Sequence, residues 1–275
     1  MPSATVRARI RPGLWASMLF IALIVMAALS PGLLTSGSPA ETDILHTLSP
    51  PGGEHLLGTD ANGRDILTRI IYGARPSLLT GLGATALGVV SGTLLGLLAS
   101  LGGRVADEIV MRLGDMVLSL PSLLLALLIL SVIGPGAVGT LYAIAIYTIP
   151  VYARLVRVQT MVIRRSLYVE AARSLGLSGP RIVARHILPN AFAPILVLAT
   201  IEVGTAIVAV SSLSFLGFAA QPPAPEWGAM LAGGKDYFGI AWWVAVFPGL
   251  AITMTVLSIT VTGRWLQRRV EGRAA

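Results

Sequence analysis

The stretch EAARSLGLSGPRIVARHILPN, residues 170–190, interrupts an otherwise apolar chain with arginines, glycines and prolines. A first short helix is predicted from Ser166 to just before Gly176, because glycine tolerates the positive φ that ends many helices. A second helix is predicted to begin at Pro180, which is accepted in a first turn, and to stop at Leu188. Leu188 precedes a proline, and that position disfavours helical backbone. We therefore expect two short helices joined by a tight turn.

The second of these helices is predicted to be amphipathic. Val183 and Ile187 are four residues apart and share one face, while Arg181 and Arg185 share another. Such a stretch can lie on anionic membrane lipid through its apolar stripe and its positive charge. It can also serve as a docking element for a soluble partner protein. The residues of the stretch leave both interpretations open.

Composition places the chain among membrane proteins. Of its 275 residues 55% are hydrophobic and only 12% are charged, and its mean hydropathy is +0.80. Soluble domains carry about 25% charged residues. The chain has no cysteine, which excludes disulfides, thiolate metal sites and cysteine nucleophiles. The net charge of +7 could suggest nucleic acid, but the basic residues follow membrane topology, so no nucleic-acid partner is expected.

Six apolar stretches are long enough to cross a bilayer as helices, which takes about 20 residues for about 30 Å of hydrocarbon. The first is too long for a cleaved signal peptide, whose apolar region has roughly 7–15 residues, so we expect it to be retained. The fourth is the weakest, because Pro150, Arg154 and Arg157 fall in its second half. The sequence predicts an all-α polytopic membrane protein with six transmembrane helices. The expected spans are Leu14–Leu34, Ser77–Leu101, Asp115–Ile133, Leu141–Val158, Pro194–Phe218 and Val244–Leu266.

Basic residues are divided unequally between the two sides of these spans. With the N-terminus inside, 16 of the 20 lysines and arginines lie on the inner side, as the positive-inside rule requires of cytoplasmic segments. Trp242 and Trp243, just before the last span, fit an outer aromatic belt. We expect both termini, and residues 170–190, in the cytoplasm. The inner residues are Arg7, Arg9, Arg11, Arg104, Arg112, Arg154, Arg157, Arg164, Arg165, Arg173, Arg181, Arg185, Arg264, Arg268, Arg269 and Arg273.

A row of small residues follows one face of the second span. Ala84, Gly88, Gly92 and Gly96 recur every four residues, a spacing that lets two membrane helices approach closely. Close packing is the preferred interpretation, and a substrate path lined by backbone is the alternative. The sequence has no phosphate-binding loop, because the only lysine, Lys235, lacks the glycine and hydroxyl partners of that motif.

Three stretches together resemble one family. Glu170-Ala171-Ala172 with Gly176 and Leu188-Pro189 resembles the EAA loop of binding-protein-dependent ABC importers, although His186 stands where isoleucine is usual. The ending HILPN is similar to the dipeptide, oligopeptide and nickel branch. LGTDANGRDILTRIIYGARPSL (57–78) and SLSFLGFAAQPPAPEWGAML (212–231) are similar to the same branch. The resemblance covers nearly the whole chain and implies a type I ABC importer permease fold with a cytoplasmic coupling loop.

The resemblance also implies a division of labour among several chains. This chain would be a permease subunit without catalytic residues or a cofactor, in the cytoplasmic membrane of a prokaryote. ATP and magnesium would be bound by two cytoplasmic ABC ATPase domains, and the other partners would be a second homologous permease and an extracytoplasmic substrate-binding protein. The cargo would be dipeptides or oligopeptides, with nickel chelates as a variant. The expected ATPase-coupling residues are Glu170, Ala171, Ala172, Gly176, Arg181, Arg185, His186, Leu188 and Pro189.

Three segments follow from this organisation. Residues 1–75 would hold an N-terminal anchor span and an extracytoplasmic segment, residues 76–266 the permease domain, and residues 267–275 a cytoplasmic tail. In the extracytoplasmic segment, Asp60, Arg64 and Asp65 precede an apolar stripe that begins at Ile66, which favours a separate interfacial helix over a contact with the binding protein.

Isolated polar residues carry weaker expectations. Glu202 lies in the fifth span, where a charge costs at least about 2.5–3.5 kcal/mol at the bilayer centre, so it must face a cavity or a partner, or be protonated. It is a candidate for the translocation path, or for pairing with the second permease. His46, His55 and His186 lack metal-ligand spacing, so no metal is expected.

Two other function classes compete with an importer permease. An ion-coupled secondary transporter or a channel would need an ion site or repeats between the halves, and only Glu202 offers a starting point. A membrane-embedded enzyme would need clustered catalytic side chains in facing spans, and the sequence shows none. The importer permease remains the leading interpretation.

Overall fold

The computed structural model describes residues 12–218 and 223–271, and this part of the chain is helical, with one isolated β-bridge between Thr59 and Asp65. The α-helices are α1 Pro12–Leu29, α2 Ile66–Leu101, α3 Gly103–Leu118, α4 Ser122–Ile133, α5 Ala137–Arg164, α6 Leu167–Ser174, α7 Gly179–Ile182, α8 Leu188–Phe215, α9 Trp227–Gly234 and α10 Trp243–Glu271. Short helical turns are η1 Pro31–Leu33, η2 Ile44–His46, the π-helical η3 Val183–Ile187 and η4 Lys235–Tyr237. Arg7, Arg9, Arg11, Arg273 and residues 219–222 lie outside the described residues.

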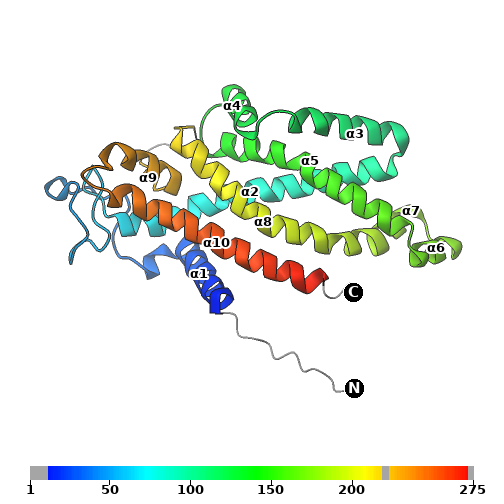
Figure 1. Ribbon diagram of the computed structural model, residues 1–275, viewed down its shortest axis with the longest axis horizontal. Helices are drawn as coiled ribbons and strands as arrows, with labels where there is room; N and C mark the ends of the chain where they lie inside the picture. The colour runs from blue at the N-terminus through cyan, green and yellow to red at the C-terminus, as the bar shows by residue number, and fades with distance from the viewer. Residues whose placement is uncertain (1–11, 219–222, 272–275) are drawn as a thin grey trace, which may run out of the picture.

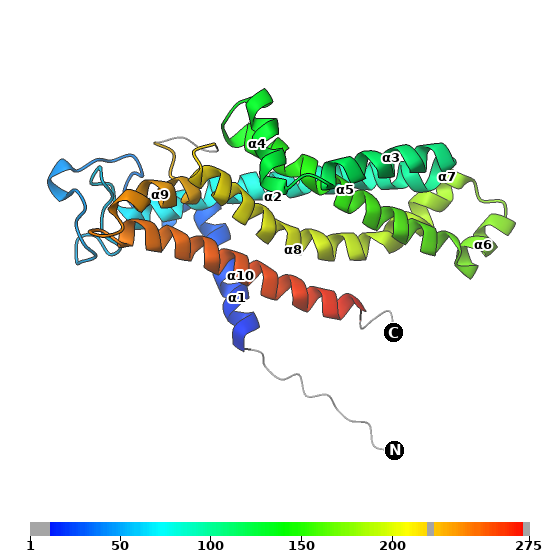
Figure 2. The same cartoon turned by 45° about the horizontal axis from the view of Figure 1, so that its top comes forward.

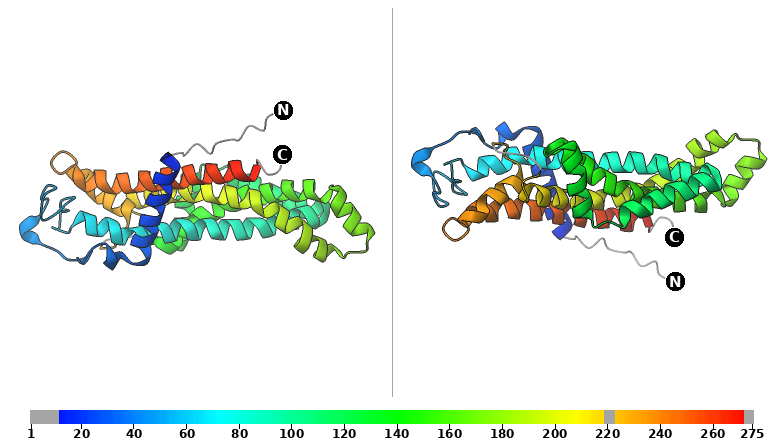
Figure 3. Two further views of the ribbon diagram at one scale, coloured as in Figure 1. Left: turned by 90° about the horizontal axis from the view of Figure 1, so that it is seen from below. Right: turned by 90° about the horizontal axis from the view of Figure 1, so that it is seen from above.

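Four long helices, α2, α5, α8 and α10, run along the length of an elongated bundle (Figure 1). The loops of residues 35–65 and α9 gather at one end, and α6 and α7 lie at the other. Helix α1 crosses the bundle obliquely and packs on α2 and α10 (Figure 3). The two ends therefore carry different segments, and the long helices connect them.

In the described part of the chain, five helical stretches are long and apolar enough to cross a membrane. They are Pro12–Leu29, Ile66–Leu101, Ala137–Arg164, Gly179–Phe215 and Trp243–Arg269. A sixth span is obtained only when α3 and α4 are counted together, since they meet at an angle of 98°. Five of the six predicted spans are thus single helices, and the third is a bent pair.

The third predicted span, Asp115–Ile133, is wrong as a single helix. Helix α3 ends at Leu118, and α4 starts only after Pro121. Proline offers no backbone N–H and disfavours helical geometry at the residue before it, so the helix breaks there. Figure 2 shows α4 projecting away from the axis of the bundle.

Two ion pairs connect helix α3 to helix α5. Arg157 donates to both carboxylate oxygens of Asp107, and Arg154 pairs with Asp115. These pairs explain why the predicted weakness of the fourth span does not shorten it: α5 continues through Pro150 and both arginines to Arg164. An arginine that has a carboxylate partner is tolerated where an unpaired one is costly.

Helix α2 begins eleven residues before the predicted start of the second span. Asp65 caps it by accepting a hydrogen bond from the backbone N–H of Thr68 at 2.7 Å. Ile66 and Arg69 in the first turns are buried. The expected separate interfacial helix is therefore wrong, because these residues form the start of a membrane-length helix.

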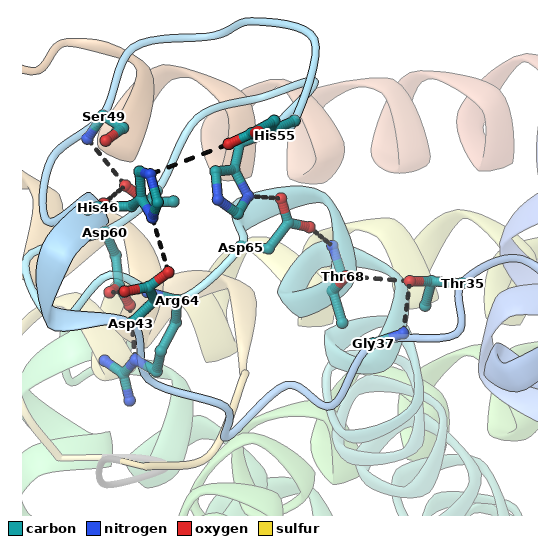
Figure 4. A network of polar contacts seen from close by, with 12 residues as sticks. Thr35, Gly37, Asp43, His46, Ser49, His55, Asp60, Arg64, Asp65 and Thr68 are labelled. Atoms are coloured by element: carbon teal, nitrogen blue, oxygen red, sulfur yellow. Dashed lines mark hydrogen bonds and ion pairs between the residues drawn. The ribbon is translucent and has the colours of Figure 1, made fainter.

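In the loops of residues 35–65, several hydrogen bonds converge on Asp60 (Figure 4). Its carboxylate accepts hydrogen bonds from the backbone N–H groups of Asn62 and Arg64 and from the Arg64 guanidinium at 2.7 Å. Nearby, the side-chain hydrogen bond with Asp43 raises the pKa of His46 and lowers the pKa of Asp43. A carboxylate that collects backbone donors closes a loop locally, so this segment needs no helix or strand.

The stretches 57–78 and 212–231, which carry two of the three resemblances, pack against each other. The Trp227 indole donates to the Ile70 carbonyl at 2.9 Å. Glu226 is buried, accepts from the Ser77 hydroxyl at 3.2 Å and caps α9 through the N–H groups of residues 228 and 229. These contacts, between residues 149 and 157 positions apart, join α9 to the first third of α2.

The predicted aromatic belt is only partly present. Trp242 is half exposed, as a belt residue should be. Trp243 is buried and donates its indole N–H to the Thr59 carbonyl at 3.2 Å. The second tryptophan thus anchors the outer loop to the start of α10, and its assignment to the belt is wrong.

The row of small residues on α2 is a packing surface, as predicted. Ala84, Gly88, Gly92 and Gly96 are all buried. A methyl group built on Gly92 would lie 2.5 Å from Tyr152 Cβ and 2.6 Å from the carbonyl oxygen of Ile149 on α5. Contacts of this length are impossible without movement of backbone, so α2 and α5 approach as closely as glycine allows.

We expect Gly92→Ala to destabilise the protein, because overpacking costs about 1–3 kcal/mol. Gly83→Ala on the same helix is the matched control. A methyl group there meets only the mobile tip of Leu141 at 2.8 Å, which can turn away. Both variants share the gain in helix propensity of about 1 kcal/mol, so their difference isolates packing.

The measurement is thermal unfolding of the purified protein in detergent. Gly92→Ala should melt several degrees below Gly83→Ala. Equal melting temperatures for the two variants would contradict the close contact of α2 with α5.

Candidate functional site

The segment between α5 and α8, residues 167–187, forms a helix-turn-helix segment at one end of the bundle (Figure 1). Its first helix, α6, ends as a Schellman motif. The N–H of Leu177 donates to the Ala172 carbonyl at 3.2 Å, and the N–H of Gly176 donates to the Arg173 carbonyl at 3.0 Å. Gly176 has φ +80°, which confirms the positive φ predicted from its place after the helix.

The second helix does not stop at Leu188, and that prediction is wrong. α7 continues through the π-helical turn η3 into α8, as one helix from residue 179 to residue 215. In a regular α-helix the ring of Pro189 would clash with the carbonyl of Arg185. The π-turn, in which the Leu188 N–H donates to the Val183 carbonyl, has a wider spacing that removes this clash. Asn190 then donates its side-chain amide to the free carbonyl of His186 at 2.6 Å.

The inner face of the helix-turn-helix segment is apolar and buried. Val169 on α6 packs into one cluster with Ile182 and Ile187 after the turn. Ala172 on α6 is buried as well. α5 contributes Tyr152, Val156 and Ile163 to this cluster, and α8 contributes Ala191 and Ile195. The predicted stripe of Val183 and Ile187 is present, but Ile182 is buried more deeply than Val183, because the π-turn shifts the register. The segment is thus attached to two long helices at once.

The outer face of the segment holds most of the predicted coupling residues. Glu170, Ala171, Gly176, Arg181, Arg185, Leu188 and Pro189 are exposed, whereas Ala172 is buried beneath them. His186 is half-buried, and its ring lies 6.3 Å from the ring of Tyr168. The structure therefore leaves most of the predicted residues open to solvent on the helix-turn-helix segment and the start of α8, while Ala172 is buried.

Within the described residues, the Glu170 carboxylate has no ion pair, neither with Arg173 nor with any other basic side chain. An ion pair with Arg173, three residues later on the same helix, would be the local alternative to a basic group of a partner protein. Its absence here leaves the carboxylate free to meet a group from outside the chain. Next to it, the backbone carbonyl of Glu170 accepts from the Ser174 hydroxyl at 3.1 Å, which reinforces α6.

Two exposed leucines on α6 and its cap belong to the same surface, and the sequence analysis missed them. Leu167 is 83% exposed and Leu175 is 80% exposed. Leu167 begins α6 and Leu175 is its C-cap, and α6 lies at the end of the bundle opposite the loops of residues 35–65 (Figure 1). Large apolar side chains so fully exposed beyond the spanning part of a bundle are typical of a protein contact. The signal was available, since neither leucine fits the apolar stripe that faces the bundle.

Glu202 is not part of this surface. It lies in the middle of α8 and lines a cavity of about 80 Å³ between α4, α5 and α8. Tyr147, Thr148 and Thr205 line the same cavity. The prediction that Glu202 faces a cavity is thus confirmed, while its role is a separate question. Among the described residues, no three His, Cys, Asp or Glu side chains are grouped so that they could hold a metal ion.

Comparison with known proteins agrees with this geometry. Residues 88–275 match the family model described as "Binding-protein-dependent transport system inner membrane component". The chain is 42% identical over 250 residues to the dipeptide transport system permease protein DppC of Alkalihalophilus pseudofirmus, covering 91% of this chain and 82% of that protein. It is 44% identical over 261 residues to the di/tripeptide transport system permease protein DppC of Pseudomonas aeruginosa, covering 93% and 86%. A glutathione transport system permease protein, GsiD of Escherichia coli, is 41% identical and covers 92% and 83%.

Solved structures share the fold at lower identity. A chain of the inward-facing MetNI methionine ABC transporter superimposes with a TM-score of 0.61 at 19% identity, covering 74% of this chain and 97% of that one. A chain of an amino acid ABC transporter gives a TM-score of 0.56 at 21% identity, covering 75% and 94%. The expected type I importer permease fold is therefore correct. With a family model that matches more than half of its length, this chain belongs to the inner membrane components of binding-protein-dependent transport systems.

Proposed function

We propose that this chain is one permease subunit of an ATP-driven importer that carries dipeptides and short oligopeptides across the cytoplasmic membrane. The observation that carries the proposal is the helix-turn-helix segment, whose exposed face has an unpaired carboxylate and two exposed leucines while its inner face is locked to α5 and α8. The names of the relatives, which refer to dipeptides, di- and tripeptides and glutathione, support a peptide cargo. Nickel chelates are the variant cargo.

Four kinds of partner complete the proposed transporter. A second, homologous permease would form the path together with this chain, and an extracytoplasmic binding protein would deliver the peptide to the outer end. Two cytoplasmic ABC ATPase domains would bind ATP and magnesium and contact the helix-turn-helix segment through Glu170, Leu167 and Leu175. Arg181 and Arg185 would contact the ATPase or the phospholipid head groups beside it.

The proposed coupling follows from rigidity. A ligand shifts a conformational equilibrium only through its different affinity for the two states. Closure of the ATPase domains would therefore change the conformation of the membrane-spanning helices only through a rigid contact with them. The buried cluster of Val169, Ile182 and Ile187 joins the segment to α5 and α8 without a flexible linker. A displacement of the segment would therefore move both helices together.

We propose a division of the chain by the task of each segment, although the segments share helices. Residues 1–75 would anchor the chain and present the outer loop, residues 76–266 would form the path, and residues 267–275 would be a tail. Both proposed boundaries fall inside helices, since α2 runs from Ile66 to Leu101 and α10 from Trp243 to Glu271. The three segments would thus share continuous helices.

An ion-coupled transporter or a channel is the competing function, and energy supply separates it from the proposal. Membrane vesicles that contain the complete importer should lose uptake of a labelled dipeptide when ATP is depleted. Collapse of the proton and sodium gradients at constant ATP should leave uptake unchanged. The reverse pattern would contradict the proposed function.

We predict that Gly176→Val uncouples transport from ATP hydrolysis. A methyl group on Gly176 meets no atom within 4 Å, so the φ of +80° is the only obstacle to a side chain there. Valine in that conformation carries strain of about 1–3 kcal/mol, comparable with the coupling energy between sites. Peptide-stimulated ATPase activity in liposomes should fall by about fivefold or more.

Gly176→Asn is the matched control, because asparagine adopts the left-handed conformation far more readily than valine. It should retain most of the stimulation. Both variants should co-purify with the second permease as the wild type does, since the spanning helices are untouched. Wild-type stimulation in Gly176→Val would remove the coupling role from this segment.

We predict that both termini lie in the cytoplasm. The chain has no cysteine, so single cysteines can be introduced without background. Glu54→Cys in the outer loop, where the side chain is 84% exposed, should react with a membrane-impermeant thiol reagent in intact spheroplasts. Ser178→Cys in the exposed turn after α6 should react only after the membrane is opened. Reaction of residue 178 and protection of residue 54 in intact spheroplasts would invert the topology.

A further inference from the structure

Glu202 sits in a small mixed cavity at the level of the bend between α3 and α4. Ser122 and Leu123, the first residues of α4, line one side of the cavity, and Tyr147 and Thr148 of α5 line another. Thr205 lies one helical turn after Glu202 on α8. The remaining walls are apolar, formed by Ala126, Ala143, Ile144, Ala206, Ala209 and Leu213. One carboxylate and several hydroxyl groups thus share an otherwise apolar chamber.

No cation within the described residues neutralises this carboxylate. The three arginines of α5 are committed elsewhere: Arg154 pairs with Asp115, Arg157 pairs with Asp107, and Arg164 donates to the Ser100 carbonyl. A carboxylate at membrane depth is costly unless it has a partner, and such residues mark substrate or ion pathways. A cation that pairs with this carboxylate would therefore come from outside the described part of this chain.

The chamber has the chemistry of an ammonium site. A primary ammonium presents three N–H donors and no acceptor, so it requires oxygen acceptors. The Glu202 carboxylate is one acceptor. The hydroxyl oxygens of Tyr147 and Thr205, which line the same cavity, can act as further acceptors. A guanidinium is larger than an ammonium and would need more room, whereas a divalent metal would need more charged ligands than this cavity holds.

The size of the cavity agrees with that chemistry. Its volume of about 80 Å³ exceeds the roughly 10–15 Å³ that one water-sized group requires, and it is too small for a whole peptide. A chain terminus could enter it while the rest of the peptide stays in the path between the two permeases. The cavity would then hold one end of an extended cargo.

We propose that Glu202 binds the free amino terminus of the peptide during passage, with the Tyr147 and Thr205 hydroxyls as further acceptors. This proposal rests on the proposed function and makes the permease itself a filter for peptides with an unblocked N-terminus. Recognition by the binding protein would thus be followed by a second selection inside the membrane.

The test compares a peptide with its N-acetylated form in liposomes that contain the complete importer. The binding protein is supplied at concentrations where it is saturated with either peptide, so its own preference does not enter the uptake rates. The wild type should import the free peptide about tenfold faster or more, because a charge-assisted hydrogen bond contributes that much discrimination. Glu202→Gln, which keeps the shape and removes the charge, should bring the ratio close to one.

Two further variants sharpen the comparison. Glu202→Asp keeps the carboxylate on a shorter stem and should retain part of the discrimination. Glu108→Gln removes an exposed carboxylate of α3 that pairs only with Arg112, and it should leave the ratio unchanged. All variants are first checked for normal yield and for co-purification with the second permease.

Three results would overturn the proposal. If Glu202→Gln slows both peptides equally, the carboxylate does not recognise the terminus. If the variant loses the second permease, Glu202 is an interface residue. If Glu202→Gln keeps the wild-type preference for the free peptide, the amino terminus is recognised elsewhere. Each differs from failure of the proposed function, in which the wild-type importer would carry neither peptide with ATP.

Discussion

The close approach of α2 and α5 is the contact on which the rest of the structure depends. Gly88, Gly92 and Gly96 bring the two backbones together, so that side chains of α5 lie directly against the backbone of α2. Between membrane helices there is no hydrophobic driving force to replace such contacts, and packing must supply the attraction. α5 in turn carries the anchor of the helix-turn-helix segment, the arginines that hold α3 and one wall of the Glu202 cavity. A shift of this one pair would therefore move every functional feature.

The two proposed sites lie on the same pair of helices. The cluster around Ile182 and Ile187 joins the helix-turn-helix segment to α5 and α8, and the Glu202 cavity lies further along these two helices. The π-turn before Pro189 keeps α7 and α8 in one continuous helix, so no hinge separates the segment from the membrane. Both proposed sites thus involve the same two helices, α5 and α8.

Charge is used differently at different depths of the bundle. At the outer end, Asp60 and Glu226 are buried and collect backbone donors, which stabilises loops that have little secondary structure. In the middle, aspartates of α3 neutralise arginines of α5. On the helix-turn-helix segment, Glu170 has no ion pair within the described residues. Glu202 is the exception at membrane depth, since its surroundings offer hydroxyl groups and no basic partner.

The sequence by itself determined the features that depend on neighbouring residues. Hydropathy located the long helices, the spacing of Ala84 and the three glycines located the packing face, and Gly176 located a turn with positive φ. Each of these is decided by the chemistry of a few adjacent positions, and the motif around Glu170 located the exposed surface in the same way. The exposure of Leu167 and Leu175 was predictable in the same way, since neither leucine fits the apolar stripe that faces the bundle.

Only the tertiary structure decided the features in which two distant segments meet. Pro121 breaks the third span locally, but the ion pairs of α3 with α5 decide where α3 lies after the break, at 98° to α4. Leu188 stays helical because a π-turn relieves the clash with Pro189 and the cluster on α5 and α8 stabilises it. Trp243 leaves the membrane belt because Thr59, 184 residues away, accepts its N–H. Local preferences amount to about 1 kcal/mol per residue, and contacts between distant segments supply enough energy to reverse them.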